Sequence, residues 1–464
     1  MAGFHIEHFG CRAARADGEA IAGNLRAMTE LEPFAADVVV VNTCSVTAEA
    51  DRAARAFIRR AHRKNPAAKI VVTGCYAQRA PQELAAMAGV AAVVGNSHKA
   101  LAPEIIRNLT REPERTASDP PRLVPVASLL TASSAQPPIF ADDRFAHSFI
   151  EDVHWGDTQP ASGAQTRPNL KIQEGCGNRC TFCVIPMTRG PSKSLPQAVV
   201  MRQVESFVAA GGKELVLSGI NLGRWGRDFA GPSRETLAGL VREILEETAL
   251  PRLRLSSIEP MDWDDEVIAL MRDFGGRRLA RHAHLPLQSG SDAVLRRMHR
   301  RYRPWHYAGK VASLLGAAGP DLTLGADVMV GFPGETDAEF EETLAFIRAL
   351  PFGYLHLFPF SPRPGTALHA AAQLAPAVMA ERMAALRALA AEKSAAHRSR
   401  FVGRELESIT LHTPAALARR GSTTALTDNF LPVELDGCLS ANRLVRVQIT
   451  GLSSESTLLA TALP

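Results

Sequence analysis

Three cysteines lie close together in the segment GCGNRCTFCVIP, which covers residues 175–186. Cys176, Cys180 and Cys183 have the spacing C-x-x-x-C-x-x-C, and their thiolates are soft ligands that suit iron–sulfur clusters or zinc. Three thiolates on one loop can hold three irons of a 4Fe-4S cluster and leave the fourth iron open. A structural zinc ion normally takes four protein ligands, and this loop offers no further Cys or His. The spacing favours the open cluster; a zinc site completed from afar or a structural cluster is the alternative.

Three further cysteines each follow a predicted strand. Cys11 ends FHIEHFGC, Cys44 ends VVVVNTC, and Cys75 follows KIVVTG. A lone cysteine is most often a small buried apolar residue, and Cys438 in the tail is predicted to be one. The carboxyl ends of parallel strands, however, meet at one edge of a sheet, where ligands bind. We therefore expect the first three to converge into a second triad.

Strands that alternate with helices must position both triads. Over residues 1–110, the apolar runs at 4–11, 38–44, 69–78 and 90–96 alternate with helical segments, which predicts a doubly wound parallel sheet. Residues 166–398 alternate again and predict an open or partial (β/α)6 barrel, whose chemistry lies at the C-terminal ends of its strands. Its predicted strands are LKIQEG, ELVLSGI, RLRLSSI, AHLPLQ, LTLGADVMVG and YLHLFPF.

Two other regions have a different character. Residues 111–165 are rich in proline and serine with little periodicity, which predicts a linker. Residues 401–464 show short strand patterns split by turn residues, which predicts a small β-domain. The whole fold class is thus α/β with a separate β-barrel at the end.

Composition sets limits on compartment and partners. The chain has 464 residues, which is long enough for about three domains, and its net charge of +4 makes any basic surface local. We identify no signal peptide and no apolar run long enough for a membrane helix, so we expect a cytoplasmic protein without a membrane partner. Its seven cysteines are then expected to be reduced, which favours metal binding over disulfides.

The 176–183 loop resembles that of radical S-adenosylmethionine (SAM) enzymes, which carry this spacing after the first strand of a partial barrel. The resemblance implies that the open iron binds SAM through its amino and carboxylate groups. An electron from the cluster then splits SAM and yields a 5′-deoxyadenosyl radical, which can abstract hydrogen from an unactivated carbon.

Both cysteine sets together resemble the methylthiotransferases of that superfamily, over residues 4–110 and 169–398. The motifs are HFGC, VNTCSVTAEAD, TGCYAQR, GCGNRCTFCVIPMTRG, LSGINLG, HLPLQSGSDAVLRRMHRRY, DVMVGFPGETDAEFEETL and FPFSPRPGT. The resemblance implies two 4Fe-4S clusters, one on Cys11, Cys44 and Cys75 that carries the sulfur for transfer. One SAM would methylate that sulfur and a second would supply the radical, with a reduced protein as electron donor.

The segments LRLSSIEP and YLHLFPFSPRPGT resemble the threonylcarbamoyladenosine branch. This implies methylthiolation at C2 of N6-threonylcarbamoyladenosine 37, in the anticodon stem-loop of tRNA. The alternatives are isopentenyladenosine in tRNA, an aspartate of a ribosomal protein, or, in another class, an RNA-binding protein with structural metal sites. Arg12 and Ala14 replace a polar residue and an asparagine of the family, which bears on hydrogen bonding around the second cluster. Met187 replaces a common tyrosine.

Several residues after the predicted strands are candidates for contacts with SAM. Ser218, Gly219 and Asn221 follow the second barrel strand, where the family holds the SAM amino group; an ordinary turn is the alternative. The other candidates follow later strands, and tight turns are the alternative for the glycines. They are Gln288, Ser289, Gly331 and Gly334.

Two basic segments are candidates for contact with RNA. The first is the helix after Cys44, with Arg52, Arg55, Arg59, Arg60, Arg63 and Lys64, and the second is RRMHRRYRPW at 296–305, with Tyr302 and Trp305. Cations neutralise phosphates and aromatic rings stack on unpaired bases, although a solvated helix face is the alternative. The tail resembles the TRAM domain, a small RNA-binding β-barrel, chiefly through LTDNFLPVEL.

Overall fold

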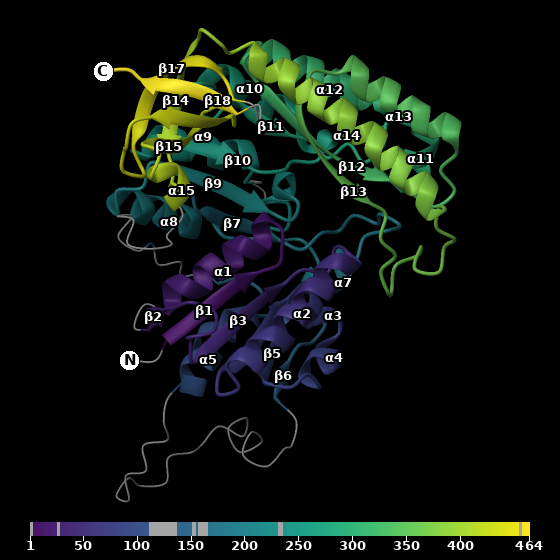
Figure 1. Ribbon diagram of the computed structural model, residues 1–464. Coiled ribbons are helices and arrows are strands. Elements are labelled where there is room, and N and C mark those ends of the chain that lie inside the picture. The colour runs from purple at the N-terminus through teal and green to yellow at the C-terminus, as the bar shows by residue number, and fades with distance from the viewer. Residues whose placement is uncertain are drawn as a thin grey trace, which may run out of the picture.

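In the computed structural model, the described residues are 3–25, 28–110, 137–150, 155, 166–230, 235–453 and 457–464. They form an N-terminal parallel sheet between helices, a central layer of parallel strands with helices outside it, and a C-terminal β-barrel (Figure 1). The predicted fold class is confirmed. None of the helices within these ranges is long and apolar enough to cross a membrane.

The N-terminal sheet has the order β2-β1-β3-β4-β5-β6, with all neighbours parallel in the part described. Val39 and Val41 pack on one face, whereas Val38 and Val40 pack on the other. Because both faces are covered, this strand is a continuous apolar run. The strands are β1 (Gly3–His8), β2 (Thr29–Glu30), β3 (Val38–Thr43), β4 (Lys69–Gly74), β5 (Val90–Gly95) and β6 (Ile139–Phe140). The helices are α1 (Arg12–Asn24), α2 (Ala48–Lys64), α3 (Cys75–Arg79), α4 (Pro81–Ala85), η1 (Asn96–Leu101) and α5 (Ala102–Thr110).

The predicted linker at 111–165 falls largely outside the described residues. Its described part contains β6, which pairs with β5 and extends the N-terminal sheet. Ile139–Phe140 therefore belong to the sheet rather than to an irregular connection. The domain boundaries at 110 and 166 stay predictions.

The central strands are parallel in the order β7-β9-β10-β11-β12-β13. Continuous hydrogen bonding stops between β10 and β11, where isolated bridges such as Ser257↔His284 connect two sheets. The predicted partial barrel is thus confirmed. Its strands are β7 (Asn169–Glu174), β9 (Glu214–Gly219), β10 (Arg252–Leu255), β11 (His282–His284), β12 (Thr323–Val330) and β13 (Phe352–Pro359), with a short antiparallel β8 (Lys193–Ser194) beside β7.

Helices cover the outside of this barrel, and the apolar core lies between them and the strands. The short α7 (Ile185–Arg189) follows the cysteine loop directly. The other elements are α8 (Gln197–Ala209), η2 (Leu222–Arg224), α9 (Leu237–Glu247), η3 (Pro260–Asp262), α10 (Asp265–Phe274), α11 (Asp292–Arg297), α12 (Pro304–Ala318), α13 (Asp337–Ala349) and α14 (Pro376–Ser399).

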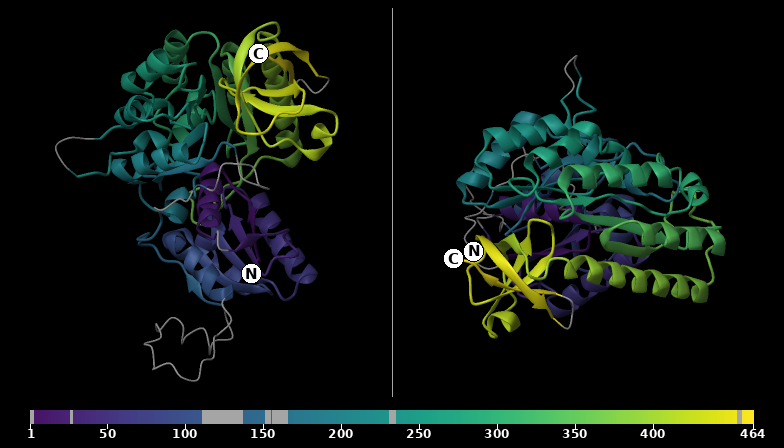
Figure 2. Two further views of the ribbon diagram at one scale, coloured as in Figure 1. Left: turned by 90° about the vertical axis from the view of Figure 1, so that its left-hand side faces the viewer. Right: turned by 90° about the horizontal axis from the view of Figure 1, so that it is seen from above.

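The C-terminal segment closes into a barrel in the order β14-β15-β16-β18-β17, as far as it is described. It packs beside the central domain (Figure 2), with ion pairs Arg252–Glu407 and Arg281–Asp428 between them. Cys438 is exposed, so the prediction that it is a core residue is wrong. The elements are β14 (Glu405–Thr410), α15 (Ala415–Ala418), β15 (Ser422–Thr427), β16 (Pro432–Asp436), β17 (Leu444–Leu452) and β18 (Leu458–Ala462).

Candidate active site

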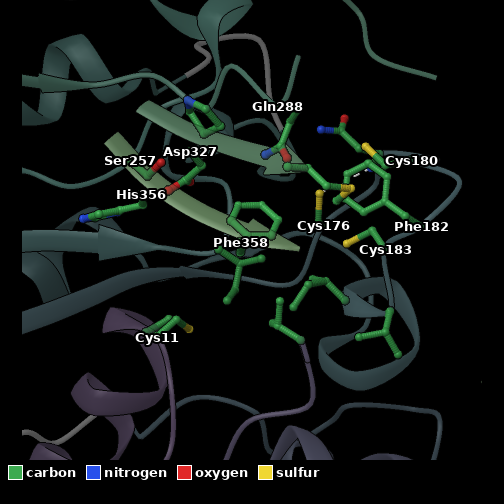
Figure 3. A pocket seen from close by; sticks show the side chains of 18 of the residues that line it. Cys11, Cys176, Cys180, Phe182, Cys183, Ser257, Gln288, Asp327, His356 and Phe358 are labelled. Carbon is green, nitrogen blue, oxygen red and sulfur yellow. Dashed lines mark hydrogen bonds and ion pairs between the residues drawn. The ribbon is translucent and has the colours of Figure 1, made fainter. Parts of the chain in front are cut away.

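A cavity of about 620 Å³ lies between the N-terminal domain and the central barrel. Gly219, His284 and Phe358, which lie at or near the C-terminal ends of central strands, line one side of it, as expected for this barrel class. The start of α1 lines the opposite side. Figure 3 shows Cys11 across the cavity from Cys176 and its two neighbours. The same cavity is therefore lined by cysteines of both sets.

The three cysteines of the loop after β7 all line this cavity. The Asn178 backbone N–H and the Asn221 side-chain amide point at Cys176 Sγ, at 3.4 and 3.7 Å. Burial raises the pKa of Cys183 to about 12 and also raises that of Cys176. These thiols stay protonated unless a cation binds them, so the site suits a metal centre that takes the thiolates.

An arginine from the segment after α11 contacts this loop and lines the same cavity. Arg300 Nη1 donates to Cys180 Sγ at 3.3 Å, while its Nη2 donates to both carboxylate oxygens of Glu259 at 2.7 and 2.5 Å. Tyr302 is fully buried and its hydroxyl donates to backbone carbonyls at Pro286 and Leu287. Tyr302 therefore cannot stack on a base, which removes it from the candidate RNA contacts of the 296–305 segment.

The second triad lies at one edge of the N-terminal sheet. The strands β1, β3 and β4 are adjacent and parallel; Cys44 and Cys75 directly follow the ends of β3 and β4, and Cys11 comes three residues after the end of β1. Burial, together with the smaller effect of the neighbouring Cys11 and Cys75, raises the pKa of Cys44 to about 12. The sheet thus brings the predicted ligands together.

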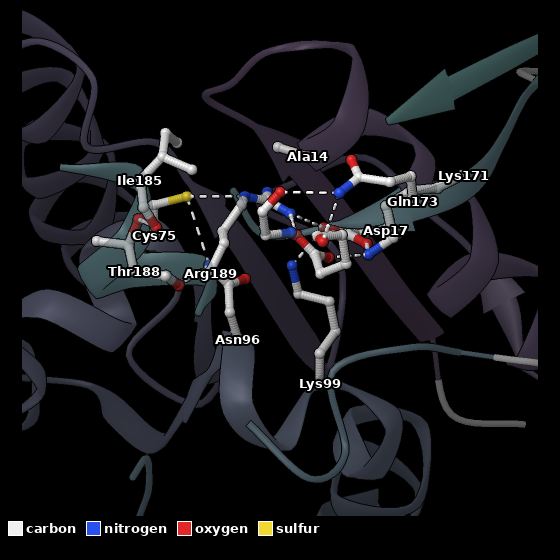
Figure 4. A network of polar contacts seen from close by, with 12 residues as sticks. Ala14, Asp17, Cys75, Asn96, Lys99, Lys171, Gln173, Ile185, Thr188 and Arg189 are labelled. Carbon is white, nitrogen blue, oxygen red and sulfur yellow. Dashed lines mark hydrogen bonds and ion pairs between the residues drawn. The ribbon is translucent and has the colours of Figure 1, made fainter. Parts of the chain in front are cut away.

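Cys75 is the member with the most polar contacts. Arg189 Nε donates to its Sγ at 3.3 Å and Asn96 Nδ2 donates at 3.4 Å (Figure 4). The same guanidinium pairs with Glu174 at 2.7 Å and with Asp17 at 3.2 Å. Donors around a sulfur are the environment that an anionic thiolate needs.

The charges around Cys75 are not balanced by the protein alone. Lys99, Lys171 and Arg189 share the two carboxylates of Asp17 and Glu174, and all five side chains are buried (Figure 4). One positive charge is in surplus within this network. Arg189 Nη2 is also buried without a hydrogen-bond partner among the described residues. A buried surplus cation is costly, so the site fits a negatively charged group on the cysteines.

The predicted SAM contacts fall into two groups. Gly219 and Gln288 line the cavity, Asn221 points at Cys176, and Gln288 Oε1 has no partner within the described chain. The other four do not line the cavity that the described residues enclose. Ser218 Oγ donates to Leu170 O at 3.4 Å, Ser289 contacts Thr343 at 3.0 Å, Gly331 lies against Met379, and the carbonyl of Gly334 accepts from Arg297.

The structure adds a polar group that the sequence patterns did not indicate. His284 Nε2 and His356 Nδ1 lie 3.2 and 3.3 Å from the carboxylate of Asp327, on the cavity wall. Tyr354 OH lies 2.9 Å from His284 Nδ1. Although burial opposes it, hydrogen bonds from both imidazoles lower the pKa of Asp327. Polar side chains inside the apolar strands β12 and β13 were the available signal.

Arg12 also lines the cavity, from the first turn of α1. Its guanidinium lies 5.3 Å from the ring centroid of Phe430, in the loop between β15 and β16. The replacement of the family's polar residue by Arg12 therefore places a cation on the cavity wall. Ala14, the other departure, is buried in α1, and its carbonyl accepts from Asn42.

The comparisons with known proteins agree with this architecture. Residues 3–95 match the uncharacterized protein family UPF0004, and residues 170–347 match the radical SAM superfamily. A solved radical SAM methyltransferase, TsrM from Kitasatospora setae, superposes with a TM-score of 0.55 at 16% identity, over 80% of this chain and 77% of that chain, which shows the fold alone. The barrel and its three-cysteine loop thus define a radical SAM enzyme.

Proteins of similar sequence show which family of radical SAM enzymes this chain belongs to. The chain is 36% identical to the threonylcarbamoyladenosine tRNA methylthiotransferase MtaB of Bacillus subtilis, over 89% of this chain and 85% of that protein. It is 33% identical to MtaB of Aquifex aeolicus, over 96% and 99%. It is also 32% identical to the tRNA-2-methylthio-N(6)-dimethylallyladenosine synthase of Erythrobacter litoralis, over 96% and 94%. The chain belongs to the tRNA methylthiotransferase family, among its MtaB-like members.

Proposed function

We propose that this enzyme inserts a methylthio group at C2 of N6-threonylcarbamoyladenosine 37 of tRNA, giving 2-methylthio-N6-threonylcarbamoyladenosine. The observation that carries the proposal is a cavity lined by all three cysteines of the first triad and by Cys11 of the second. Formation of a C–S bond at an unactivated carbon needs a radical source and a sulfur source that reach the same atom. A cavity lined by Cys11 on one side and Cys176 on the other meets that requirement.

Cys176, Cys180 and Cys183 would hold one 4Fe-4S cluster, and Cys11, Cys44 and Cys75 the second. When bound, the clusters and SAM supply the radical, the methyl group and the sulfur for transfer. Arg300 and Arg189 donate hydrogen bonds to one sulfur of each triad and stabilise its anionic form. The donor sets and the surplus positive charge near Cys75 support this assignment.

The chain's other residues would bind and orient SAM. Gly219 presents backbone without a side chain at the cavity wall, and Gln288 presents a free amide oxygen that can accept from an amino group. Asn221 approaches the first cluster ligand. Ser218, Ser289, Gly331 and Gly334 have local partners, and we assign them the support of the loops that carry these contacts.

The anticodon stem-loop would approach beside α2. Val46 and Thr47 line the cavity directly before this helix, and Val46 is exposed. The exposed side chains of Arg52, Arg59 and Arg63 continue along the helix surface. Cations next to the opening can neutralise the phosphates on either side of an extruded adenosine. A cytoplasmic location and a reduced protein electron donor complete the proposal.

Nucleoside mass spectrometry of tRNA from a deletion strain tests the substrate. We expect 2-methylthio-N6-threonylcarbamoyladenosine to disappear and to return with the gene on a plasmid. Its persistence, together with the loss of the methylthio-isopentenyl nucleoside, would assign the enzyme to the other tRNA branch. Unchanged tRNA nucleosides with loss of a methylthio-aspartate would point to the ribosomal protein.

A further inference from the structure

Arg12 lies where all three parts of the chain meet. It belongs to α1, its guanidinium lies over Phe430 of the C-terminal barrel, and Asp327 and Tyr354 of the central sheet are its electrostatic neighbours. It is one of the residues that line the cavity. A cation here faces the substrate space from the side opposite the Cys176 loop.

No hydrogen bond or ion pair to the Arg12 guanidinium exists among the residues that the structure describes. The two carboxylates on the cavity wall are already engaged. Asp327 is held between His284 and His356, and Glu259 pairs with Arg300. A cation–π contact with an aromatic ring stabilises a guanidinium less than an ion pair with a carboxylate does. Arg12 is therefore a charged donor that awaits an anionic partner inside the cavity.

The candidate substrates differ in the charge that they would bring to this position. A threonylcarbamoyl group carries a carboxylate on its N6 substituent, whereas an isopentenyl group is an uncharged hydrocarbon. A guanidinium matches a carboxylate with two parallel N–H donors, which gives geometric as well as electrostatic selection. An unpaired arginine beside the site disfavours the hydrocarbon, because that substrate would cover the half-buried cation without giving it a partner.

We propose that Arg12 binds the carboxylate of the N6-threonylcarbamoyl group and thereby selects this substrate over uncharged N6 substituents. The assignment rests on the proposed function and adds its specificity-determining residue. Two other anions have the same chemistry, a tRNA phosphate and the carboxylate of SAM. The experiment must therefore distinguish whether Arg12 binds the threonylcarbamoyl carboxylate, a tRNA phosphate or the SAM carboxylate.

The test compares anticodon stem-loops that differ only at the N6 substituent. Binding to the reconstituted enzyme is measured by fluorescence anisotropy with threonylcarbamoyladenosine, its methyl ester or plain adenosine at position 37. For the unaltered enzyme, we expect esterification to weaken binding at least about tenfold, because it removes a charge-assisted contact. Arg12→Gln should bind the acid as weakly as the unaltered enzyme binds the ester, and it should not distinguish the two.

Arg12→Lys keeps the charge without the bidentate geometry and should restore part of the preference. Arg15→Gln is the matched control, because this exposed arginine lies on the same helix but is not among the residues that line the cavity. Iron content and the absorbance of the reconstituted clusters are measured in every variant. We expect both to match the unaltered enzyme, which separates substrate binding from damage next to Cys11.

Each contrary result has a defined meaning. Equal weakening of all three stem-loops by Arg12→Gln would assign Arg12 to a phosphate, and a raised KM for SAM would assign it to the SAM carboxylate; either overturns the proposal. Insensitivity of the unaltered enzyme to esterification would overturn it without any variant. If the unaltered enzyme modifies isopentenyladenosine instead, the proposed function itself fails.

Discussion

Arg189 Nε lies 3.3 Å from Cys75 Sγ, and this contact joins the two halves of the site. Arg189 ends α7, the helix that begins two residues after Cys183. The segment that supplies one triad therefore also supplies the cation beside the other. At the other triad, Arg300 Nη1 likewise lies 3.3 Å from Cys180 Sγ. Each set of thiols thus has a guanidinium that donates to one sulfur.

Replacement of Asp17 by Asn should destabilise the protein. The buried cations Lys99, Lys171 and Arg189 lose a shared carboxylate, and removal of a charge that buried partners need costs about 3–5 kcal/mol. Urea unfolding of the metal-free protein measures this loss without the clusters. Arg144→Met is a suitable control, because the Arg144 side chain is 80% exposed and its pairing contributes little. Equal stability of the two variants would contradict the structural role of the network.

Stability should fall as the pH drops from 7.5 to 5, in part through His397. Burial lowers its pKa from 6.5 to about 4, and its Nε2 lies 2.8 Å from Thr323 Oγ1. Between these pKa values the unfolded chain binds more protons than the folded chain, so acid favours unfolding. The contribution of this one group over that interval is about 2 kcal/mol. His397→Gln should lose stability at pH 7.5 but show a pH dependence shallower by that amount; an unchanged slope would exclude His397 as the cause.

The α2 surface should contribute electrostatically to tRNA binding. Arg59 and Arg63 are exposed and lie one turn apart, so they present two charges on one face. The double change to Gln should weaken binding for every stem-loop and reduce the slope of log K against log salt by roughly 2. Arg348 and Arg387, exposed on α13 and α14, provide a control pair of equal charge. The same loss in the control pair would mean that only net charge matters.

Strand ends made much of the site predictable from sequence. Apolar runs followed by Cys11, Cys44 or Cys75 require only that the strands be parallel, and the sheet has that arrangement. The 176–183 loop is local, so its spacing alone brings the three sulfurs to one side of the barrel. Such features depend on short-range geometry and on one rule of sheet topology.

The rest depends on how distant segments pack. Arg12 meets Phe430 only because the C-terminal barrel docks against the central sheet, and no local pattern encodes that contact. His284 and Asp327 come from the adjacent parallel strands β11 and β12 and become partners through the register of that pairing. The burial of Tyr302 was not predictable, because the sequence of a basic, aromatic segment does not show which of its rings is buried. Tyr302 is fully buried, whereas Trp305 in the same segment is 58% exposed.

The assignment of separate roles to the two triads is tested most directly by one reaction with Cys44→Ala. The reconstituted variant is incubated with SAM, reductant and threonylcarbamoyladenosine tRNA, and 5′-deoxyadenosine and methylthiolated nucleoside are quantified together by mass spectrometry. We predict that the variant still forms 5′-deoxyadenosine, because Cys176, Cys180 and Cys183 are intact, but yields no methylthiolated product. Methylthiolation at the rate of the unaltered enzyme would contradict a sulfur-bearing cluster on Cys11, Cys44 and Cys75.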